Sequence, residues 1–325
     1  MIIDYILSQL SENGVTINSG RCHYCMISSN RGLNGNDLIF LFPEHKNKPS
    51  YVIKIGRTPE NSKALINEFN WIKFLGEHQK GLSKLPIVYF LNSLSGHVYF
   101  VQSIVEGIGL DMALLSWGID ARVQRHLDQA IDFLVNLQGI YPQEDAQSIS
   151  EASRIFEEHL KDIGADPAQI TQIRKSANAV GLTSCLIHGD FWVTNVLVDK
   201  KRSRINGIID FEYANDFCYT YFDIFWFVIT LSMFTGDSSS SGDLLYSYKN
   251  AFFFSKCMPL YSEIFEKYFK KLLKKKPPLF DLFVISLLYG AFRGKGLFGH
   301  STDMDEICRE LLFWSIDNES EFNLH

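Results

Sequence analysis

The chain has 325 residues, of which 46% are hydrophobic and 21% charged, an ordinary composition for a globular protein with a large core in one domain or two lobes. Its formal net charge of −6 argues against nucleic acid as a main partner, because a phosphate backbone calls for a basic surface. The same acidic balance suits a cationic substrate.

Three stretches bear on where the protein is located. The opening sequence MIID lacks the basic start and the apolar core of a secretory signal. The apolar runs 219–234 and 278–292 contain Asp223 and Asp281, and neither reaches the roughly 20 uninterrupted apolar residues of a membrane span. We expect both runs to be buried helices and the protein to be cytoplasmic.

The first third of the chain reads mainly as strands. Residues 2–12 form an amphipathic helix, and strands are predicted at 22–28 and 37–42. The turn at 28–35 contains two glycines, so its backbone N–H groups could hold phosphates, or it could be a plain hairpin turn. Cys22 and Cys25 form a C-x-x-C with no second pair, which indicates reduced structural thiols.

Lys54 lies inside the apolar strand 51–55, where a charge costs free energy unless it meets an anion. The helix predicted at 61–77 carries two carboxylates, Glu68 and Glu77, either of which could be that anion. The other interpretation is a solvent-facing lysine and a glutamate on the helix surface. Two strands follow, at 87–91 and 97–103. Beyond about residue 105 the pattern becomes helical, with helices predicted at 121–139, 151–163 and 166–180.

Two later apolar runs each end in an acidic residue. The sequence CLIHGDFWVTN, residues 185–195, carries Asp190 and Asn195, and IIDFE, residues 208–212, carries Asp210. Phosphoryl transfer needs a carboxylate that orients the attacking hydroxyl and oxygen ligands for Mg²⁺. We expect Asp190 to be the catalytic base, and Asn195 and Asp210 to bind Mg²⁺. The alternative is two buried strands that end in ordinary turn acids.

His188-Gly189-Asp190, with Asn195 and Asp210, resembles the signature of the aminoglycoside phosphotransferase and choline/ethanolamine kinase superfamily. The resemblance is tight over 186–223 and weaker back to about residue 50. It implies an α+β, two-lobed protein-kinase-like fold. Residues 1–104 would be a nucleotide-binding lobe with a small sheet, and residues 105–325 a larger, mainly helical lobe for catalysis and substrate binding.

The resemblance also implies roles for individual residues. Lys54 would pair with the α- and β-phosphates of ATP, and Glu68 would hold Lys54. Backbone groups near Ser103 and Val105, at the hinge between the lobes, would bind the adenine edge. His188 would shape the catalytic loop by hydrogen bonding.

Asp223 stands where the family places an aspartate that accepts backbone N–H bonds from the catalytic loop. Gly189 and Glu212 stand where protein kinases usually carry an arginine and the glycine of D-F-G. No A-P-E follows, so the sequence argues against a protein kinase. The sequence around Asp210 and Asp223 is more similar to choline and ethanolamine kinases, whereas the H-G-D motif is more similar to aminoglycoside phosphotransferases.

The C-terminal third is expected to form the acceptor side, where each feature has two interpretations. The aromatic group could be a cage for an ammonium ion or part of a helix core; it comprises Phe225, Trp226 and Phe227. The acidic group could meet an amine or begin a helix; it comprises Asp303, Asp305, Glu306 and Glu310. The lysines of 267–276 could face an anionic membrane or be a solvated helix face.

The expected function is Mg²⁺-dependent transfer of the ATP γ-phosphate to a hydroxyl of a small molecule, such as an amino alcohol, an aminoglycoside or a sugar. The alternative is a catalytically silent nucleotide-binding pseudokinase or regulatory protein of the same fold. The presence of Lys54, Asp190, Asn195 and Asp210 together favours the enzyme. The sequence leaves open the acceptor, the choice of ATP or GTP, the oligomeric state and the pathway.

Overall fold

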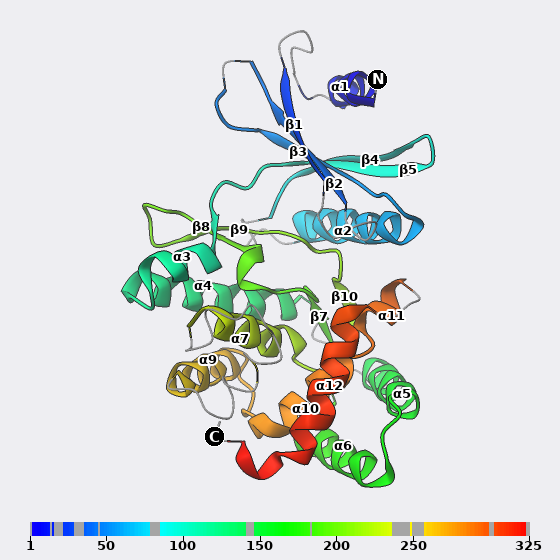
Figure 1. Ribbon diagram of the computed structural model, residues 1–325, viewed down its shortest axis with the longest axis vertical. Helices are drawn as coiled ribbons and strands as arrows, with labels where there is room; N and C mark the ends of the chain where they lie inside the picture. The colour runs from blue at the N-terminus through cyan, green and yellow to red at the C-terminus, as the bar shows by residue number, and fades with distance from the viewer. Residues whose placement is uncertain are drawn as a thin grey trace. The chain divides into compact units, whose positions relative to one another are not determined.

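The computed structural model describes residues 2–13, 15, 22–28, 36–44, 46–78, 85–140, 146–182, 184–235, 248, 257–298 and 302–322 (Figure 1). The chain forms two compact units. The first unit is Met1–Glu106 together with Gly207–Glu212, and the second unit is Gly107–Asn206 together with Tyr213–His325. The short segment Gly207–Glu212, which carries Asp210, therefore belongs to the first unit although in sequence it lies between the two parts of the second.

The first unit contains a five-stranded antiparallel sheet in the order β1-β2-β3-β5-β4. Its elements are α1 (Ile2–Glu12), β1 (His23–Ser28), β2 (Asp37–Phe42), β3 (Tyr51–Ile55), α2 (Pro59–His78), β4 (Val88–Leu94) and β5 (His97–Ser103). These bounds follow the predicted elements closely. The predicted phosphate-binding turn falls largely on residues 29–35, which lie outside the described residues, so its role stays a prediction.

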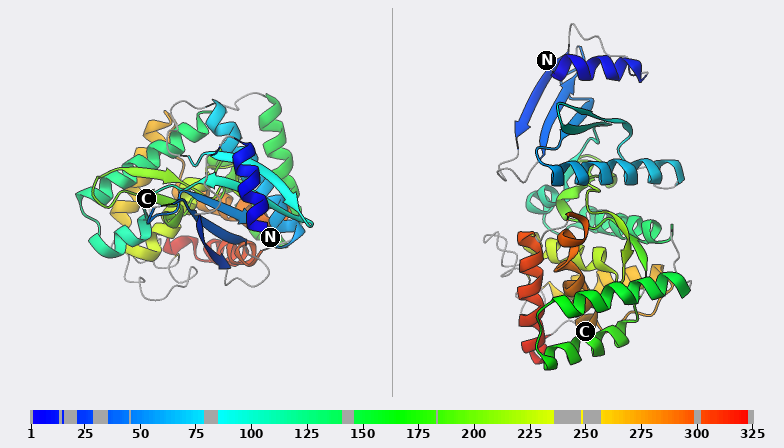
Figure 2. Two further views of the ribbon diagram at one scale, coloured as in Figure 1. Left: turned by 90° about the horizontal axis from the view of Figure 1, so that it is seen from above. Right: turned by 90° about the vertical axis from the view of Figure 1, so that its right-hand side faces the viewer.

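Helices α1 and α2 lie on opposite faces of this sheet (Figures 1 and 2). Side chains alternate between the two faces along a strand. On β3, Ile53 and Ile55 pack in the cluster that also contains Ile6 and Leu10 of α1. Lys54, between them, points to the other face and contacts α2. The alternation of β3 thus buries its apolar side chains under one helix and directs the lysine toward the other.

The second unit is mainly helical, with short two- and three-stranded sheets in the orders β10-β7 and β6-β8-β9. Its helices are α3 (Leu110–Trp117), α4 (Ala121–Gln138), α5 (Ala146–Asp162), α6 (Pro167–Val180), α7 (Phe222–Thr235), α9 (Met258–Lys271), α10 (Leu279–Gly290), α11 (Arg293–Phe298) and α12 (Asp303–Asp317). Its strands and 3₁₀ turns are β6 (Ile108–Gly109), β7 (Cys185–Ile187), η3 (Val193–Asn195), β8 (Val196–Val198), β9 (Ile205–Ile208, which continues into the first unit), β10 (Asn215–Cys218) and η5 (Glu319–Glu321).

Helices α7 and α10 form the core of the second unit. Both are apolar around most of their circumference and almost completely buried, as expected for helices that other helices surround. This confirms that the two long apolar runs are core helices. Within the part of the chain that the structure describes, no helix is long and apolar enough to cross a membrane.

Local signals set several of the helix ends. Asp166 caps α6 by accepting the N–H groups of Ala168 and Gln169, and Pro167 occupies the first helical position, as predicted. Helix α5 begins at Ala146, earlier than the predicted residue 151, and α3 was not predicted. With eight residues, α3 is too short to show a clear helical period.

Candidate active site

Lys54 lies at the centre of a charged cluster in the first unit. Its Nζ donates to both carboxylate oxygens of Glu68, at 2.7 and 2.8 Å, and to Oδ1 of Asp210 at 2.9 Å. The three residues come from β3, α2 and the segment after β9. The Glu68 side chain is completely buried, whereas 33% of the Asp210 side chain is exposed. The structure thus brings together three of the residues that the sequence singled out.

Burial and charge act in opposite directions on this cluster. Burial alone would lower the pKa of the Lys54 ammonium, but the charges of Asp210 and Glu68 raise that pKa above its ordinary value. Burial also raises the pKa of the Glu68 carboxyl to about 7, against the opposing effect of Lys54. Lys54 therefore keeps its positive charge in a site that excludes most water.

The Asp210 backbone has φ of +74°, in the left-handed region that few residues other than glycine adopt. Such strain persists only where the surrounding structure enforces it, and it is concentrated at functional sites. Here the amide of Asn67 on α2 donates to the carbonyl oxygen of Glu212 at 2.9 Å, which ties the segment after Asp210 to α2.

The predicted adenine-binding segment follows β5. The N–H of Ser103 donates to the Ile87 carbonyl at 2.8 Å, and the N–H of Ile104 donates to the Ser50 carbonyl at 3.0 Å. These two donors are already used within the first unit, so a contact of Ser103 with adenine is limited to its carbonyl oxygen. The binding roles of Ser103 and Val105 stay predictions.

Gly189 begins the sharp turn of the predicted catalytic loop, residues 188–195, in the second unit. Its φ is +77°, and a Cβ atom at this position would overlap the backbone carbonyl of Tyr213. A residue with a side chain would meet both problems at once. The glycine of H-G-D, where protein kinases usually carry arginine, is therefore required by the local backbone.

Asp223, in the first turn of α7, holds this loop in place. Its two carboxylate oxygens accept the backbone N–H groups of His188 at 2.7 Å and Gly189 at 2.9 Å. The predicted role of Asp223 as an acceptor for the catalytic loop is confirmed. Burial raises the pKa of the Asp223 carboxyl to about 7, although the two N–H groups and Arg293 act to lower it.

Asp190, the predicted base, is held at three points. Its Oδ1 accepts a hydrogen bond from Nη1 of Arg293 at 3.2 Å. Its Oδ2 accepts one from Nδ2 of Asn195 at 3.3 Å, and the same nitrogen donates to the Asp190 carbonyl at 2.9 Å. The N–H of Asp190 donates to Nδ1 of His188 at 3.3 Å, a contact that fits the predicted loop-shaping role of that histidine.

Arg293 is the residue of this site that the sequence analysis missed. It is the first residue of α11, it is buried, and its guanidinium also donates to the carbonyl oxygen of Gly189. A signal was present in the sequence. Arg293 directly follows the apolar run 278–292, and a charge beside buried residues calls for a partner, as it did for Lys54.

The candidate acceptor features are now assigned to structural roles. Phe225, Trp226 and Phe227 are completely buried in α7, which supports the core interpretation. Asp305 is also buried, and it forms a capping box with Thr302 at the start of α12. The interpretation of Asp305 as part of a helix start is confirmed.

Two lysines of α9 are paired with acidic residues of α4. Lys267 Nζ lies 2.8 Å from Asp128 Oδ1 on α4, and Lys271 pairs with Asp132 on the same helix. Lys276, beyond the end of α9, pairs with Glu266 at 2.5 Å. These ion pairs support the interpretation of a solvated helix face over a membrane-binding face.

Solved structures that resemble this chain include three phosphotransferases. A type VIII aminoglycoside-3'-phosphotransferase is 13% identical, with a TM-score of 0.41, over 90% of this chain and 93% of that one. An ethanolamine kinase of Plasmodium vivax is 14% identical, with a TM-score of 0.47, over 90% and 82%. A spectinomycin phosphotransferase in complex with ADP and spectinomycin is 12% identical, with a TM-score of 0.49, over 96% and 98%.

A search of curated proteins finds no match. A model of the phosphotransferase enzyme family matches residues 40–239, which include every candidate site residue except Arg293. The family match, together with a sheet-containing unit and a mainly helical unit, confirms the predicted α+β protein-kinase-like fold. The chain therefore belongs to the phosphotransferase enzyme family, as the resemblance in residues 186–223 indicated.

Proposed function

We propose that this protein transfers the γ-phosphate of ATP to a hydroxyl group of a small molecule. The observation that carries the proposal is the support around Asp190. Its carboxylate is bound by Arg293 and Asn195, and its loop is fixed by Asp223. A carboxylate held this firmly in a phosphotransferase suits the orientation of an attacking hydroxyl, because phosphoryl transfer depends mainly on positioning and electrostatics.

In this proposal, Asp190 accepts the hydrogen bond of the acceptor hydroxyl and takes up its proton as the bond to phosphorus forms. The hydroxyl oxygen attacks the γ-phosphorus and ADP leaves. His188 holds the backbone N–H of Asp190 and stabilises the loop, so it takes no part in proton transfer. The second unit, Gly107–Asn206 with Tyr213–His325, provides this base and binds the acceptor in this proposal.

The first unit, Met1–Glu106 with Gly207–Glu212, binds the nucleotide in this proposal. Lys54 stays charged because Asp210 and Glu68 raise its pKa, so it can pair with the α- and β-phosphates. Glu68 fixes the direction of the ammonium through two hydrogen bonds. Backbone groups of Ser103 and Val105 bind the adenine edge.

The donor set fits Mg²⁺. Asp210 offers carboxylate oxygens, and the amide nitrogen of Asn195 is bound to Asp190, which leaves the amide oxygen as the natural ligand atom. Mg²⁺ prefers hard oxygen ligands of this kind. When bound, Mg²⁺ supplies charge neutralisation for the phosphates. We therefore propose Asn195 and Asp210 as its ligands. We also propose that the protein is cytoplasmic.

The test is phosphate transfer from ATP, with Mg²⁺, to a panel of choline, ethanolamine, several aminoglycosides and simple sugars. Products are identified by mass spectrometry, and the variants Asp190→Ala and Asp210→Ala are assayed in parallel. A phosphorylated product that both substitutions abolish is the expected result. If the wild type binds ATP but phosphorylates none of these acceptors, the alternative of a nucleotide-binding protein without kinase activity gains ground.

A further inference from the structure

Arg293 is a buried cation enclosed by aromatic rings. The centre of its guanidinium lies 4.2 Å from the ring centroid of Tyr213, 5.3 Å from that of Trp226 and 5.7 Å from that of Phe222. Its side chain is only 4% exposed. Distances of this size are typical of cation–π contacts, which are strongest where water is excluded. We call the three rings the aromatic cage.

The same guanidinium is bound to the catalytic loop. Nη1 donates to the Gly189 carbonyl and lies 3.2 Å from Oδ1 of Asp190. Burial alone would lower the pKa of Arg293, but the charge of Asp190 raises that pKa. A planar guanidinium can stack on aromatic rings while its N–H groups bind acceptors, whereas the compact ammonium of a lysine is more strongly hydrated.

Helix α11 is anchored so that Arg293 cannot easily turn away. The Asp305 carboxylate accepts the backbone N–H groups of Gly294 at 3.1 Å and Lys295 at 3.2 Å. A Cβ atom on Gly294 would lie 2.5 Å from Thr302 Cγ2 and 2.8 Å from Asp305 Oδ2. The absence of a side chain at Gly294 thus lets α11 pack closely against the start of α12.

On these grounds, and resting on the proposed function, we propose that Arg293 is the positioning residue of Asp190. We further propose that, by filling the aromatic cage, it directs the enzyme toward acceptors with no ammonium group beside the reacting hydroxyl. An aromatic cage next to a catalytic carboxylate would suit a choline-like cation. Here the protein's own guanidinium takes that place.

The consequence for acceptor choice follows from distance. In choline and ethanolamine only two carbons separate the ammonium from the hydroxyl. A hydroxyl bound to Asp190 would bring such an ammonium close to Arg293, and like charges repel strongly in a site of low effective dielectric. Neutral hydroxyl compounds, such as sugars, avoid this repulsion. We expect a preference of at least about tenfold for the neutral acceptor.

The experiment uses the full-length chain with Arg293→Ala and Arg293→Lys. Arg122→Ala is the matched control, because Arg122 also stacks on an aromatic ring, at 4.6 Å from Trp117, but does not contact the catalytic loop. Turnover of the acceptor found in the panel is measured with 20 mM guanidinium chloride or with the same concentration of sodium chloride. Calorimetry measures the binding of tetramethylammonium and of guanidinium.

In Arg293→Ala we expect kcat to fall about 100-fold while the KM for ATP changes less than about threefold. Added guanidinium should raise the kcat of Arg293→Ala at least tenfold, because it binds in the aromatic cage. If Arg293 had only a structural role, guanidinium would not change kcat. The kcat of Arg293→Lys should lie between those of the wild type and Arg293→Ala. The kcat of Arg122→Ala should equal that of the wild type. Tetramethylammonium should bind Arg293→Ala and not the wild type.

The inference is overturned if Arg293→Ala turns over like the wild type, if guanidinium restores nothing, or if the wild type binds tetramethylammonium as well as the variant does. A wild type that phosphorylates no acceptor counts against the proposed function, and the two calorimetric titrations then still decide the role of the cage. If Arg293→Ala does not fold, Arg293→Gln and Arg293→Lys carry the same comparison.

Discussion

In the two units, the central side chain of the candidate site and the side chains that support it carry opposite charges. In the first, a cation, Lys54, is held by two carboxylates, those of Glu68 and Asp210. In the second, a carboxylate, Asp190, is held by a cation, Arg293. In both, one supporting side chain is almost fully buried, with Glu68 0% and Arg293 4% exposed, whereas 33% of Asp210 and 19% of Asp190 are exposed.

The difference lies in how the support is built. Lys54 and Glu68 are 14 residues apart, on a strand and the next helix. Asp190 and Arg293 are 103 residues apart and are joined through α7, α10 and α11. A substitution that removes a supporting contact in the first unit should therefore affect only the charged cluster around Lys54. A substitution that removes such a contact in the second unit should also affect the packing of several helices.

Among substitutions of residues other than Asp190 and Asp210, the largest effect is expected from Lys54→Met. It removes the cation and leaves the buried Glu68 carboxylate without its partner, so kcat/KM for ATP should fall at least about 100-fold. Glu68→Gln should cost about tenfold, because Lys54 keeps its contact with Asp210. Initial rates over a range of ATP concentrations measure both. An equal loss in the two variants would contradict the assignment of Lys54 as the phosphate ligand.

Asp223→Ala tests the support in the second unit. The N–H groups of His188 and Gly189 would lose their acceptor, and bonds to a charged group contribute about 1.5–3 kcal/mol each. We expect a loss of about 3 kcal/mol in unfolding free energy and a 10- to 100-fold fall in kcat. Urea denaturation and steady-state kinetics measure them. Asp223→Asn, which keeps one acceptor, should be intermediate, and a fully active Asp223→Ala would remove Asp223 from loop positioning.

Gly189→Ala should lower the unfolding free energy by about 2 kcal/mol, because it combines a positive φ with an overlap at Tyr213. Gly181→Ala is the matched control. Gly181 also has a positive φ, +72°, but a Cβ atom there would meet nothing within 4 Å. It should cost about 1 kcal/mol and leave kcat unchanged. Equal melting temperatures and equal kcat values for the two variants would show that the overlap is unimportant.

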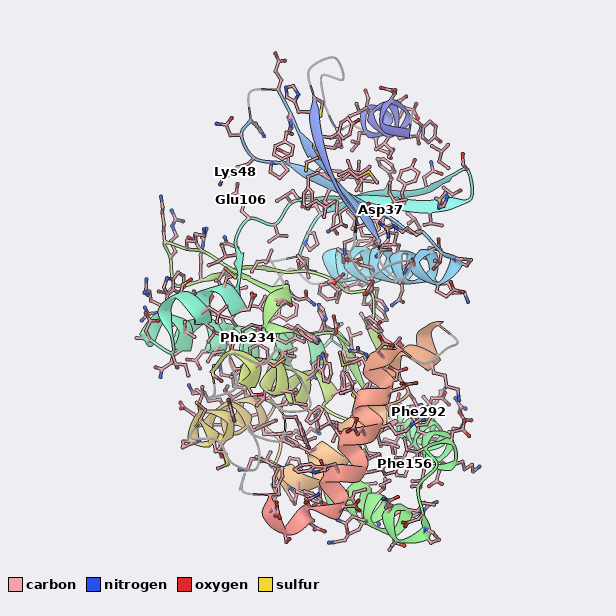
Figure 3. The ribbon with its side chains drawn as sticks, in the orientation of Figure 1. Asp37, Lys48, Glu106, Phe156, Phe234 and Phe292 are labelled. Carbon is pink, nitrogen blue, oxygen red and sulfur yellow. The ribbon has the colours of Figure 1, made fainter. Side chains whose placement is uncertain are left out.

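A further prediction concerns stability at acidic pH and involves His159, whose ring stacks on that of Phe292, a residue labelled in Figure 3, with 4.4 Å between the ring centroids. Burial lowers the pKa of His159 to about 4, against about 6.5 in an unfolded chain. Between these values the unfolded state binds more protons, so the contribution of His159 to stability is complete above pH 6.5 and is lost as the pH falls toward 4.

His159→Gln should therefore flatten the pH dependence of the melting temperature between pH 4 and 6.5, relative to the wild type. The difference is at most about 3 kcal/mol. Parallel thermal melts at several pH values measure it. Unchanged pH dependence in the variant would mean that the ring is as accessible to protons in the folded protein as in the unfolded chain.

Much of the first unit could be predicted from the sequence because its signals are local. A lysine within an apolar strand indicated a partner of opposite charge, and the resemblance to kinases indicated Glu68 on the following helix, a pair that the structure contains. In the second unit, Asp190 and Asn195 were evident from their spacing. The resemblance to a known family indicated Asp223. The catalytic and binding roles of these residues stay predictions.

Arg293 could not be paired with Asp190 from the sequence. The contact depends on how α10 and α11 pack, and α11 has only six residues, too few for a helical period. Likewise, the closeness of Arg293 to Tyr213, Phe222 and Trp226 is a product of tertiary packing. Of these three rings, only Trp226 belonged to the group that the sequence indicated as a possible cage, and nothing local showed that the protein's own side chain lies against it.

The most direct test of the account compares one acidic residue from each unit. ATP binding, with and without Mg²⁺, and turnover are measured for Asp190→Ala and Asp210→Ala. We predict that Asp190→Ala binds ATP within about threefold of the wild type, keeps the Mg²⁺ dependence of binding and loses at least about 1,000-fold in turnover. Asp210→Ala should lose the Mg²⁺-dependent part of ATP binding. Wild-type turnover in Asp190→Ala, or unchanged Mg²⁺ dependence in Asp210→Ala, would contradict the proposed division of roles between the two units.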